Sequence, residues 1–525
     1  MVSSGISNRR YLLLAVLFIF LTVLISGAMA VYVLSDSDIH ETHMLALAAI
    51  QIDRAYGEDV DWDRLLDAGM EGMFEQLDRF SGYLDPGRFE RVHEEFAGAY
   101  VGIGVNVIKH DDGLMVMSVR ENGPAAEVGL LSGDIIIEVD SIKLSGLGAE
   151  AATDLLRGEE GTEVGVITYR PVSEDTLYMQ ITRSRMDLIH IPFAGFTPDS
   201  AIYVRLLGFD AGAARDLEKA LDSLLGSEDI DATSIILDLR GNPGGLFTEA
   251  YHTANLFLEE GQFIVGTKGR LRWNDQSFHS TGNDLTGGLP LAVIVDGGSA
   301  SSAEIVAGAL KQLDRATLIG DTTFGKGLVQ GFAPLTEGGA LSLTISRYYL
   351  HGNVFLNEFD TVLNDVGHGL VPDHIIKFTE YDPFPRAVEY SLLLNRFANQ
   401  HQDEIIASSG EFGLDDNWVD RFEDFAHQEG FEYQSPVTHS AERLLEIARM
   451  RQVPSVVLEA AERIAEKARL DDTRQFSQYT RYIAMRLKQI AFARKYDVYT
   501  AYAKAIVPER PDIQLAGQIL TEKSR

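Results

Sequence analysis

The stretch LAVIVDGGSASSAEIVAGAL, residues 291–310, determines the fold expected for the centre of this chain. Its first five residues are all apolar, as in a β-strand that is buried on both faces of a sheet. Asp296, Gly297 and Gly298 then break the strand, and apolar residues recur at helical spacing from Ala303 onward. The stretch therefore predicts a buried strand that turns directly into a helix.

The same alternation is found before this stretch. Apolar runs predict strands at 202–209 and 234–239, and amphipathic spacing predicts helices at 211–225 and 247–257. Strands that alternate with helices indicate a mainly parallel sheet with helices on both faces. We therefore expect an α/β domain, which we place at residues 186–380.

The rest of the chain has a different texture, and its length of 525 residues also indicates several domains. Residues 35–96 show helical spacing and form a predicted N-terminal helical segment. Residues 97–185 hold short β-rich runs between turn residues, with one helical stretch at 149–156, and predict a small β-rich domain. Residues 381–525 have helical texture and carry no catalytic motif, so a helical C-terminal domain is expected.

Residues 1–34 have the features of a membrane anchor. Residues 11–34 carry no charge and follow Arg9 and Arg10. A helix of about 20 apolar residues spans a bilayer, and flanking arginines stay in the cytoplasm, so the body of the chain is expected in the periplasm or extracellular space. Residues 28–30, Ala-Met-Ala, also have the small-x-small form of a cleavage site, so a removed signal segment is the alternative.

Composition excludes several classes of partner and chemistry. The net charge is −33, from 78 acidic and 45 basic residues, and such a surface repels nucleic acid. The chain has no cysteine, which excludes disulfide scaffolds, thiolate zinc sites and cysteine catalysis. No grouping of the 13 histidines with acidic residues has a metal-site spacing. We expect neither a metal nor another cofactor.

Ser301 is a candidate nucleophile because it lies where the central strand feeds the helix. Backbone N–H groups are unpaired at a helix N-terminus, so an oxyanion can be stabilised there. The alternative is purely structural, since Ser301 and Glu304 have the spacing of a capping box. Ser299 and Ser302 also compete for the role of nucleophile.

Lys326, in the stretch GDTTFGKG at residues 320–327, is the candidate base. A lysine can take the proton of a serine only when burial lowers its pKa from about 10.4. Its neighbours are glycine or apolar, and the neutral amide of Gln330 could orient the amine without keeping it charged. A phosphate-binding loop is the rival interpretation, but Gly327 lacks the hydroxyl that binds magnesium and a strand, not a helix, is expected next.

The stretch LDLRGNPGG, residues 237–245, ends the preceding buried strand in a glycine-rich turn. Ligands of such sheets bind beyond the carboxyl ends of the strands. The backbone N–H of Gly244 or Gly245 could complete an oxyanion hole together with that of Ser302. The alternative is a tight turn that needs glycine for its backbone conformation alone.

Four motifs in this order resemble those of the C-terminal processing, or tail-specific, peptidases, which are Ser/Lys serine endopeptidases. The motifs are LDLRGNPGG at 237–245, GSASSAE at 298–304, GDTTFGKG with Gln330 at 320–330, and GLVPD at 369–373. The resemblance covers roughly residues 45–375. It implies that Ser301 is the nucleophile, Lys326 the base and Gln330 the orienting amide. Ser302 and Ala303 stand where members commonly have alanine and then serine.

The β-rich region resembles the PDZ domain of this family. NGPAAEVGLLSGD, at 122–134, matches the middle of such a domain, and YVGIG, at 100–104, matches the loop that receives a peptide carboxylate. The departure is Ser141, which replaces the usual glycine of a turn. Residues implied to hold the carboxylate are Gly102, Ile103 and Gly104. In some relatives an arginine like Arg157 links the PDZ domain to the protease body.

The resemblance implies a membrane-anchored endopeptidase whose substrates are proteins or peptides with free apolar C-termini. Such a peptide adds to the PDZ domain as a β-strand, which raises its concentration at the active site. The C-terminal helices resemble extensions that serve dimerisation or adaptor binding in some members. A catalytically silent PDZ adaptor, which binds C-termini without cleaving them, is the alternative function.

Overall fold

The computed structural model describes residues 37–171, 173–336, 338–356, 369–378, 380, 382–409, 416–495, 507 and 510–523. The chain divides into two units, Met1–Leu77 and Asp78–Arg525. Within those ranges no helix combines the length and apolar character that crossing a bilayer requires. The predicted membrane segment, residues 11–34, lies outside the described residues.

The described part of the first unit consists of two helices, α2 (Ser37–Ala55) and α3 (Trp62–Phe74). The Asp61 carboxylate accepts a hydrogen bond from the backbone N–H of Arg64 at 3.2 Å and so caps the start of α3. The second unit opens with β1 (Gly82–Leu84) and α4 (Pro86–Phe96). The helical spacing of this region therefore corresponds to three separate helices.

The β-rich domain is built on an antiparallel sheet of strand order β3-β4-β5-β7-β8, with β6 paired to β5. Its elements are β3 (Val105–His110), β4 (Gly113–Val119), α5 (Pro124–Glu127), β5 (Ile135–Val139), β6 (Ile142–Lys143), α6 (Ala149–Asp154), β7 (Glu163–Arg170) and β8 (Asp175–Thr182). A separate pair, β2 (Ala99–Gly102) and β9 (Ser184–Asp187), flanks the sheet in sequence. The predicted β-rich domain is confirmed, and β3 lies at the edge of its sheet.

The α/β domain contains a six-stranded sheet of order β10-β11-β12-β15-β16-β20. The strands are β10 (Phe193–Phe196), β11 (Ala201–Arg205), β12 (Ser234–Asp238), β15 (Leu291–Val295), β16 (Ala316–Gly320) and β20 (His374–Ile375). Only β10 runs antiparallel to its neighbour; β11 to β20 are parallel. Every residue of β12, β15 and β16 is buried, so the prediction of a mainly parallel, doubly covered sheet is confirmed.

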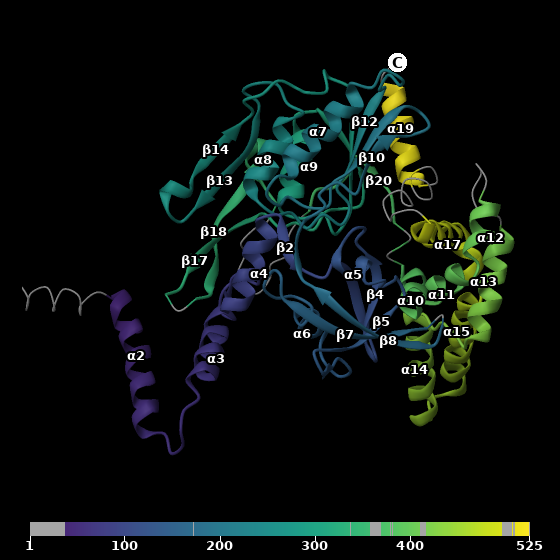
Figure 1. The fold of residues 1–525 in the computed structure, drawn as a ribbon, viewed down its shortest axis with the longest axis horizontal. Helices are drawn as coiled ribbons and strands as arrows, with labels where there is room; N and C mark the ends of the chain where they lie inside the picture. The colour runs from purple at the N-terminus through teal and green to yellow at the C-terminus, as the bar shows by residue number, and fades with distance from the viewer. Residues whose placement is uncertain are drawn as a thin grey trace, which may run out of the picture. The chain divides into compact units, whose positions relative to one another are not determined.

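The two faces of this sheet are covered by helices from distant parts of the chain (Figure 1). On one face, alternate strand residues such as Leu237 pack with α7 (Ala213–Leu225), α8 (Phe247–Asn255) and α9 (Ser302–Gln312). On the other face, residues such as Ile236 pack with α19 (Pro511–Lys523). The period-two alternation of strand side chains thus separates two cores.

A second sheet is centred on β18, the longest strand. Strand β18 pairs with β1, β13, β17 and β19, and β14 pairs with β13. The bounds are β13 (Phe263–Gly269), η1 (Arg272–Asn274), β14 (Gln276–His279), β17 (Leu328–Pro334), β18 (Ala340–Leu350), η2 (His351–Asn353) and β19 (Val354–Phe355). The residues after Lys326 therefore enter strand β17, as expected from the sequence, and not a helix of the kind that a phosphate-binding loop opens.

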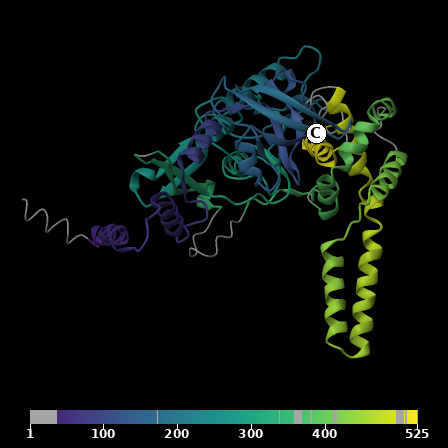
Figure 2. The ribbon, with the colours of Figure 1, turned by 60° about the horizontal axis from the view of Figure 1, so that its bottom comes forward.

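The C-terminal region is helical, as predicted. Its helices are α10 (Pro383–Ser391), α11 (Leu393–Gln400), α12 (Gln402–Ser408), α13 (Asp416–Gln428), α14 (Pro436–Met450), α15 (Ser455–Asp472), α16 (Gln475–Gln478) and α17 (Thr480–Lys495). Figure 2 shows α14 and α15 side by side as a hairpin, whose seam consists mainly of alanines such as Ala441 and Ala465. Among the described C-terminal helices, α19 is the one that packs on the α/β sheet.

Candidate active site

Ser301 occupies the N-cap of α9 in a conformation that few L-residues adopt. Its φ is +54° and its ψ is −113°. This conformation is strained, and strain of this kind persists where surrounding contacts enforce it. The Ser301 N–H donates to Glu304 Oε2 at 2.8 Å, so part of the predicted capping box is formed. Ser301 is half-buried, which leaves it accessible at the strand-to-helix turn.

The two competing serines have hydroxyl groups that are buried and engaged. Ser299 is fully buried, and its Oγ donates to the carbonyl of Leu239 at 2.8 Å. Ser302 is also buried, and its Oγ donates to the carbonyl of Gly245 at 3.0 Å. These hydroxyls fix the loop that follows β12, whereas Ser301 lies at the more exposed position.

The Glu304 carboxylate joins the backbones of the two candidate catalytic residues. Its Oε2 accepts from the N–H of Ser301 and from the N–H of Lys326, each at 2.8 Å. Its Oε1 accepts from the N–H of Gly325 at 2.7 Å and from the hydroxyl of Thr323 at 2.5 Å. Burial raises the pKa of Glu304, while these four donors lower it. One buried side chain therefore holds the helix start and the lysine loop together.

Tyr348, on β18, contacts the same two residues through their carbonyl groups. Its hydroxyl lies 2.6 Å from the carbonyl oxygen of Lys326 and 3.2 Å from that of Ser301. Burial, together with the Glu304 carboxylate, raises the pKa of Tyr348, so the hydroxyl stays a donor. Residues 301 and 326 are thus connected through both their N–H and their C=O groups.

The side chain of Lys326 lies in a largely apolar environment. Its Nζ is 5.0 Å from the centre of the Phe80 ring, and no described residue accepts a hydrogen bond from it. Burial lowers the pKa of Lys326, while the carboxylates of Asp78 and Glu304 act in the opposite direction. The expected desolvation of this lysine is therefore present. Its charged form is poorly solvated, which favours the neutral amine.

Replacing Asp78 by asparagine should shift the acid limb of the rate profile to lower pH. The Asp78 carboxylate raises the pKa of Lys326, so its removal lowers that pKa further. A larger fraction of Lys326 is then neutral at a given pH, and the reaction can begin at lower pH. We expect this shift in the pH dependence of kcat/KM. The matched control is Asp321→Asn, an exposed carboxylate of the lysine loop, which should cause no shift; a shift of D78N to higher pH would contradict the assignment.

Gln330, predicted to orient Lys326, makes a different contact. Its Nε2 donates to Thr344 Oγ1 at 3.1 Å, and Thr344 Oγ1 donates to Asp78 Oδ1 at 3.0 Å. Among the described residues, no hydrogen bond joins the side chains of Gln330 and Lys326. The amide is therefore linked to the carboxylate that acts on Lys326 and not to the amine directly.

The glycine-rich turn lies against Ser301. A Cβ atom on Gly244, whose φ is +100°, would be 2.8 Å from Ser301 Cβ and 2.9 Å from the backbone nitrogen of Ser302. Glycine is thus required at 244 both for its φ and for this approach. The N–H of Gly244 donates to Asn242 Oδ1 at 2.9 Å. Of the three predicted oxyanion donors, only Gly245 and Ser302 have N–H groups without an acceptor among the described residues.

The predicted carboxylate-binding loop lines a cavity of about 460 Å³ at the edge of the β-rich domain, whose wall also includes Glu95 of α4 and Asp210 of the α/β domain. Gly102, Ile103 and Gly104 lie in its wall, together with residues of β3 and α6. The carbonyl of Ile103 accepts from Ala125 N–H at 2.9 Å, which fixes the loop to the domain. Because β3 is an edge strand, a peptide lying in this cavity can extend the sheet.

Arg157 lines the same cavity and reaches the helix that precedes the β-rich domain. Its Nη2 lies 3.9 Å from Glu95 Oε1 on α4. The next residue, Phe96, accepts a hydrogen bond through its carbonyl from the N–H of Ala211 at 3.1 Å. Arg157 thus lies near the end of α4, which contacts the α/β domain, and its role in coupling the two domains stays a prediction.

Several residues of this site do not emerge from the sequence. Glu304 is evident there only as part of a capping box, and Tyr348, Asp78 and Phe80 belong to no motif. The spacing of Ser301 and Glu304 was the one available signal, because the other contacts join segments far apart in the chain. Within the described ranges, no group of three or more side chains of the metal-binding types is arranged to hold a metal ion.

Three parts of the chain match known protein families. Residues 200–367 match Peptidase family S41, residues 101–181 match the PDZ domain, and residues 392–520 match a family described as "Probable PDZ-protease, C-terminal helical domain". Together with the strand-to-helix serine, these matches define the class: the chain is a serine-type peptidase with a PDZ domain.

The relatives narrow this class. The carboxy-terminal-processing protease of Bartonella bacilliformis is 34% identical over 319 residues, which cover 60% of this chain and 70% of the relative. The carboxy-terminal processing protease CtpA of Bacillus subtilis is 30% identical over 341 residues, which cover 63% of this chain and 72% of the relative. The chain belongs to the carboxy-terminal processing protease family. Among solved structures, the photosystem II D1 C-terminal processing protease is 25% identical, covers 62% of this chain and 91% of that one, and has a TM-score of 0.37.

Proposed function

We propose that this protein is a Ser/Lys endopeptidase that captures the free C-terminus of a substrate polypeptide in its PDZ domain. It then cleaves the substrate with Ser301 as the nucleophile. The observation that carries the proposal is the shared Glu304 oxygen, which accepts from both the Ser301 and the Lys326 N–H groups at 2.8 Å. A structural cap needs only the first of these bonds. The second brings a half-buried lysine of lowered pKa to the helix start that carries the serine.

The proposed reaction begins when neutral Lys326 accepts the proton of the Ser301 hydroxyl. The serine oxygen bonds to the scissile carbonyl carbon, and the resulting oxyanion accepts hydrogen bonds from the N–H groups of Gly245 and Ser302. Protonated Lys326 then gives its proton to the leaving amine as the C–N bond breaks. Water hydrolyses the acyl-enzyme, again with Lys326 as the base. Gln330 acts through Thr344 and Asp78, which tune the charge near the lysine.

Recognition of the substrate is proposed to take place at Gly102, Ile103 and Gly104. Their backbone N–H groups hold the terminal carboxylate while the preceding residues pair with the edge of β3. Capture raises the effective concentration of the tail at the active site, so that a shallow site suffices for selectivity. Apolar residues such as Ile103 and Leu156 in and beside the cavity favour an apolar C-terminus.

Cleavage should therefore depend on a free terminal carboxylate. For an unstructured peptide with an apolar C-terminus, we expect kcat/KM to fall roughly 10- to 100-fold when the C-terminus is amidated, since the bound tail loses its charged anchor. The measurement is the rate of product formation for the matched pair of peptides. Equal rates would remove the PDZ domain from the proposal, whereas binding of the free peptide without any cleavage would favour the silent adaptor.

The surroundings in which the enzyme works are part of the proposal. Residues 11–34 are uncharged and follow two arginines, so we place the anchor in the inner or plasma membrane and the catalytic body in the periplasm or extracellular space. The helical regions are proposed to serve self-association or the binding of an adaptor protein. Fractionation of cells that express the full chain, with protease access to each side of the membrane, tests the orientation.

A further inference from the structure

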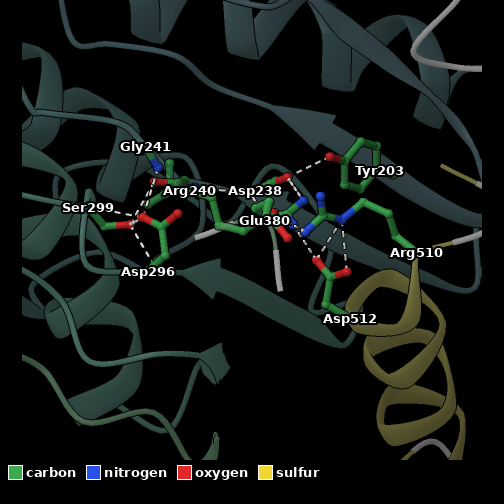
Figure 3. Close-up of polar contacts among 10 residues, drawn as sticks. Tyr203, Asp238, Arg240, Gly241, Asp296, Ser299, Glu380, Arg510 and Asp512 are labelled. Carbon is green, nitrogen blue, oxygen red and sulfur yellow. Dashed lines mark hydrogen bonds and ion pairs between the residues drawn. The ribbon is translucent and has the colours of Figure 1, made fainter. Parts of the chain in front are cut away.

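A buried cluster of charged side chains joins α19 to the end of strand β12 (Figure 3). Asp512, in the first turn of α19, is 1% exposed, and its Oδ2 lies 2.6 Å from Nη1 of Arg240. Arg240 follows β12 and is itself 4% exposed. On its other edge Asp512 accepts from Arg510 Nε at 2.9 Å, and Arg510 pairs with Glu380 at 2.9 Å.

Arg240 is held from two sides. Its Nε and its backbone N–H both donate to Asp238 Oδ1, at 2.9 and 3.0 Å, and its Nη2 pairs with Asp238 Oδ2. Tyr203 donates to the same carboxylate at 2.6 Å. Burial alone would raise the pKa of Asp238, but Arg240 lowers it, to about 2. Asp238 thus fixes one edge of the guanidinium, and Asp512 forms an ion pair with the remaining nitrogen, Nη1, which makes no hydrogen bond within the described residues.

The backbone of Arg240 leads directly into the glycine-rich turn at Ser301. The next residue, Gly241, donates its N–H to Asp296 Oδ1 at 2.9 Å, and the Ser299 hydroxyl contacts the same oxygen at 3.3 Å. Asn242 accepts the N–H of Ala300 through its carbonyl at 3.0 Å. Figure 3 shows Gly241, Asp296 and Ser299 grouped on one side of Arg240 and Asp512 on the other. A shift of Arg240 would therefore move the turn relative to Ser301.

We propose that Asp512 is a positioning residue for the oxyanion site: α19, through the ion pair of Asp512 with Arg240, holds the turn 241–245 in the geometry that the reaction needs. The rate of the chemical step then depends on a helix that touches neither Ser301 nor the cavity of the PDZ domain. Without the Asp512 charge, the buried Nη1 of Arg240 would have no charged partner, since Asp238 faces only the other nitrogens, and it would seek another partner or water. Small displacements at a reacting centre are costly to rate. This inference rests on the proposed peptidase function.

The test compares Asp512→Asn with the wild-type protein, using the full chain and two probes. One is cleavage of an unstructured peptide with an apolar C-terminus; the other is the rate at which a fluorophosphonate labels the active-site serine, because its phosphonyl oxygen occupies the oxyanion site. We expect D512N to lower kcat and the labelling rate about 10- to 100-fold, with KM and peptide binding little changed. Asp512→Glu, which keeps the charge, should recover part of the loss.

The matched control is Glu389→Gln, which removes a half-buried ion pair of the helical region, that of Glu389 with Arg486. We expect E389Q to lower the melting temperature but to label at the wild-type rate. A wild-type labelling rate in folded D512N, or an equal loss in E389Q, would overturn the inference. If the wild-type protein itself neither cleaves nor labels, the proposed function fails instead, so the two failures are distinguishable.

A second variant covers the case in which D512N does not fold. In Arg510→Lys, Asp512 keeps its charge and its contact with Arg240 but loses the guanidinium that orients it. We expect a several-fold lower labelling rate with unchanged peptide binding. A wild-type rate in R510K together with unfolded D512N would also overturn the proposal, because Asp512 would then matter for folding alone.

Discussion

Replacement of Lys326 by alanine should reduce kcat for peptide cleavage on the order of 10⁴-fold, which corresponds to about 5.5 kcal/mol of transition-state stabilisation. The reason is that the Ser301 hydroxyl then has no base in its vicinity, since the neighbouring carboxylate of Glu304 is already occupied by four donors. Ser301→Ala should have an equally large effect, and the double variant should be no worse than either single one, because the two residues act as a unit.

Two controls accompany this experiment. Binding of the peptide, measured by fluorescence anisotropy, should be unchanged in K326A, because the cavity at Gly102–Gly104 is a separate site. Lys268→Ala, an exposed lysine on β13, should cleave at the wild-type rate. Full activity of K326A would refute the Ser/Lys assignment, and full activity of S301A would exclude Ser301 as the nucleophile.

The second large effect is expected for Glu304→Gln. Glutamine has the same shape, but its Nε2 donates and cannot accept the N–H groups that the carboxylate receives on both oxygens. The donors that lose their acceptor are either the Ser301 and Lys326 N–H groups or the Gly325 N–H and the Thr323 hydroxyl. We expect kcat to fall about 10²- to 10³-fold through misplacement of the base, and the free energy of unfolding to fall by about 1–3 kcal/mol.

The matched control for E304Q is Asp284→Asn, at another buried carboxylate of the α/β domain. Asp284 accepts from Thr286 N–H at 2.8 Å and pairs with Arg315 at 3.0 Å, in the loop before β15. The D284N variant should lose stability to a similar extent as E304Q but keep the wild-type kcat. If E304Q were destabilised yet cleaved as fast as the wild type, Glu304 would be a helix cap only.

Much of this architecture can be predicted from the sequence because local signals agree with tertiary ones. The all-apolar run of β15 reports burial on both faces, and the serine-rich turn after it reports the start of α9. The β-rich domain can be predicted equally well, since turn residues separate its short strands. The position of Ser301 at a strand-to-helix turn follows from these patterns alone.

The contacts that organise the site are less accessible to prediction. Lys326 reaches Glu304 through its backbone N–H, so the residue type at 326 gives no hint of the bond. The Gly244 N–H donates to the side chain of Asn242, and this hydrogen bond depends on the φ and ψ values of a five-residue turn. Asp512 lies in a helix without any motif, and only the tertiary fold brings it to Arg240.

The position of α19 also has a consequence for the order in which the molecule folds. Asp512 follows Arg240 by 272 residues (512 − 240), so their contact closes one of the longest loops in the chain. Contacts between such distant residues form slowly, because the entropic cost of closing a long loop comes before the contact stabilises the chain. Until α19 docks, Ile236, Ile294 and Ile319 present one apolar face of the sheet to water. Maturation of the peptidase is therefore expected to follow, and not accompany, the folding of its sheet.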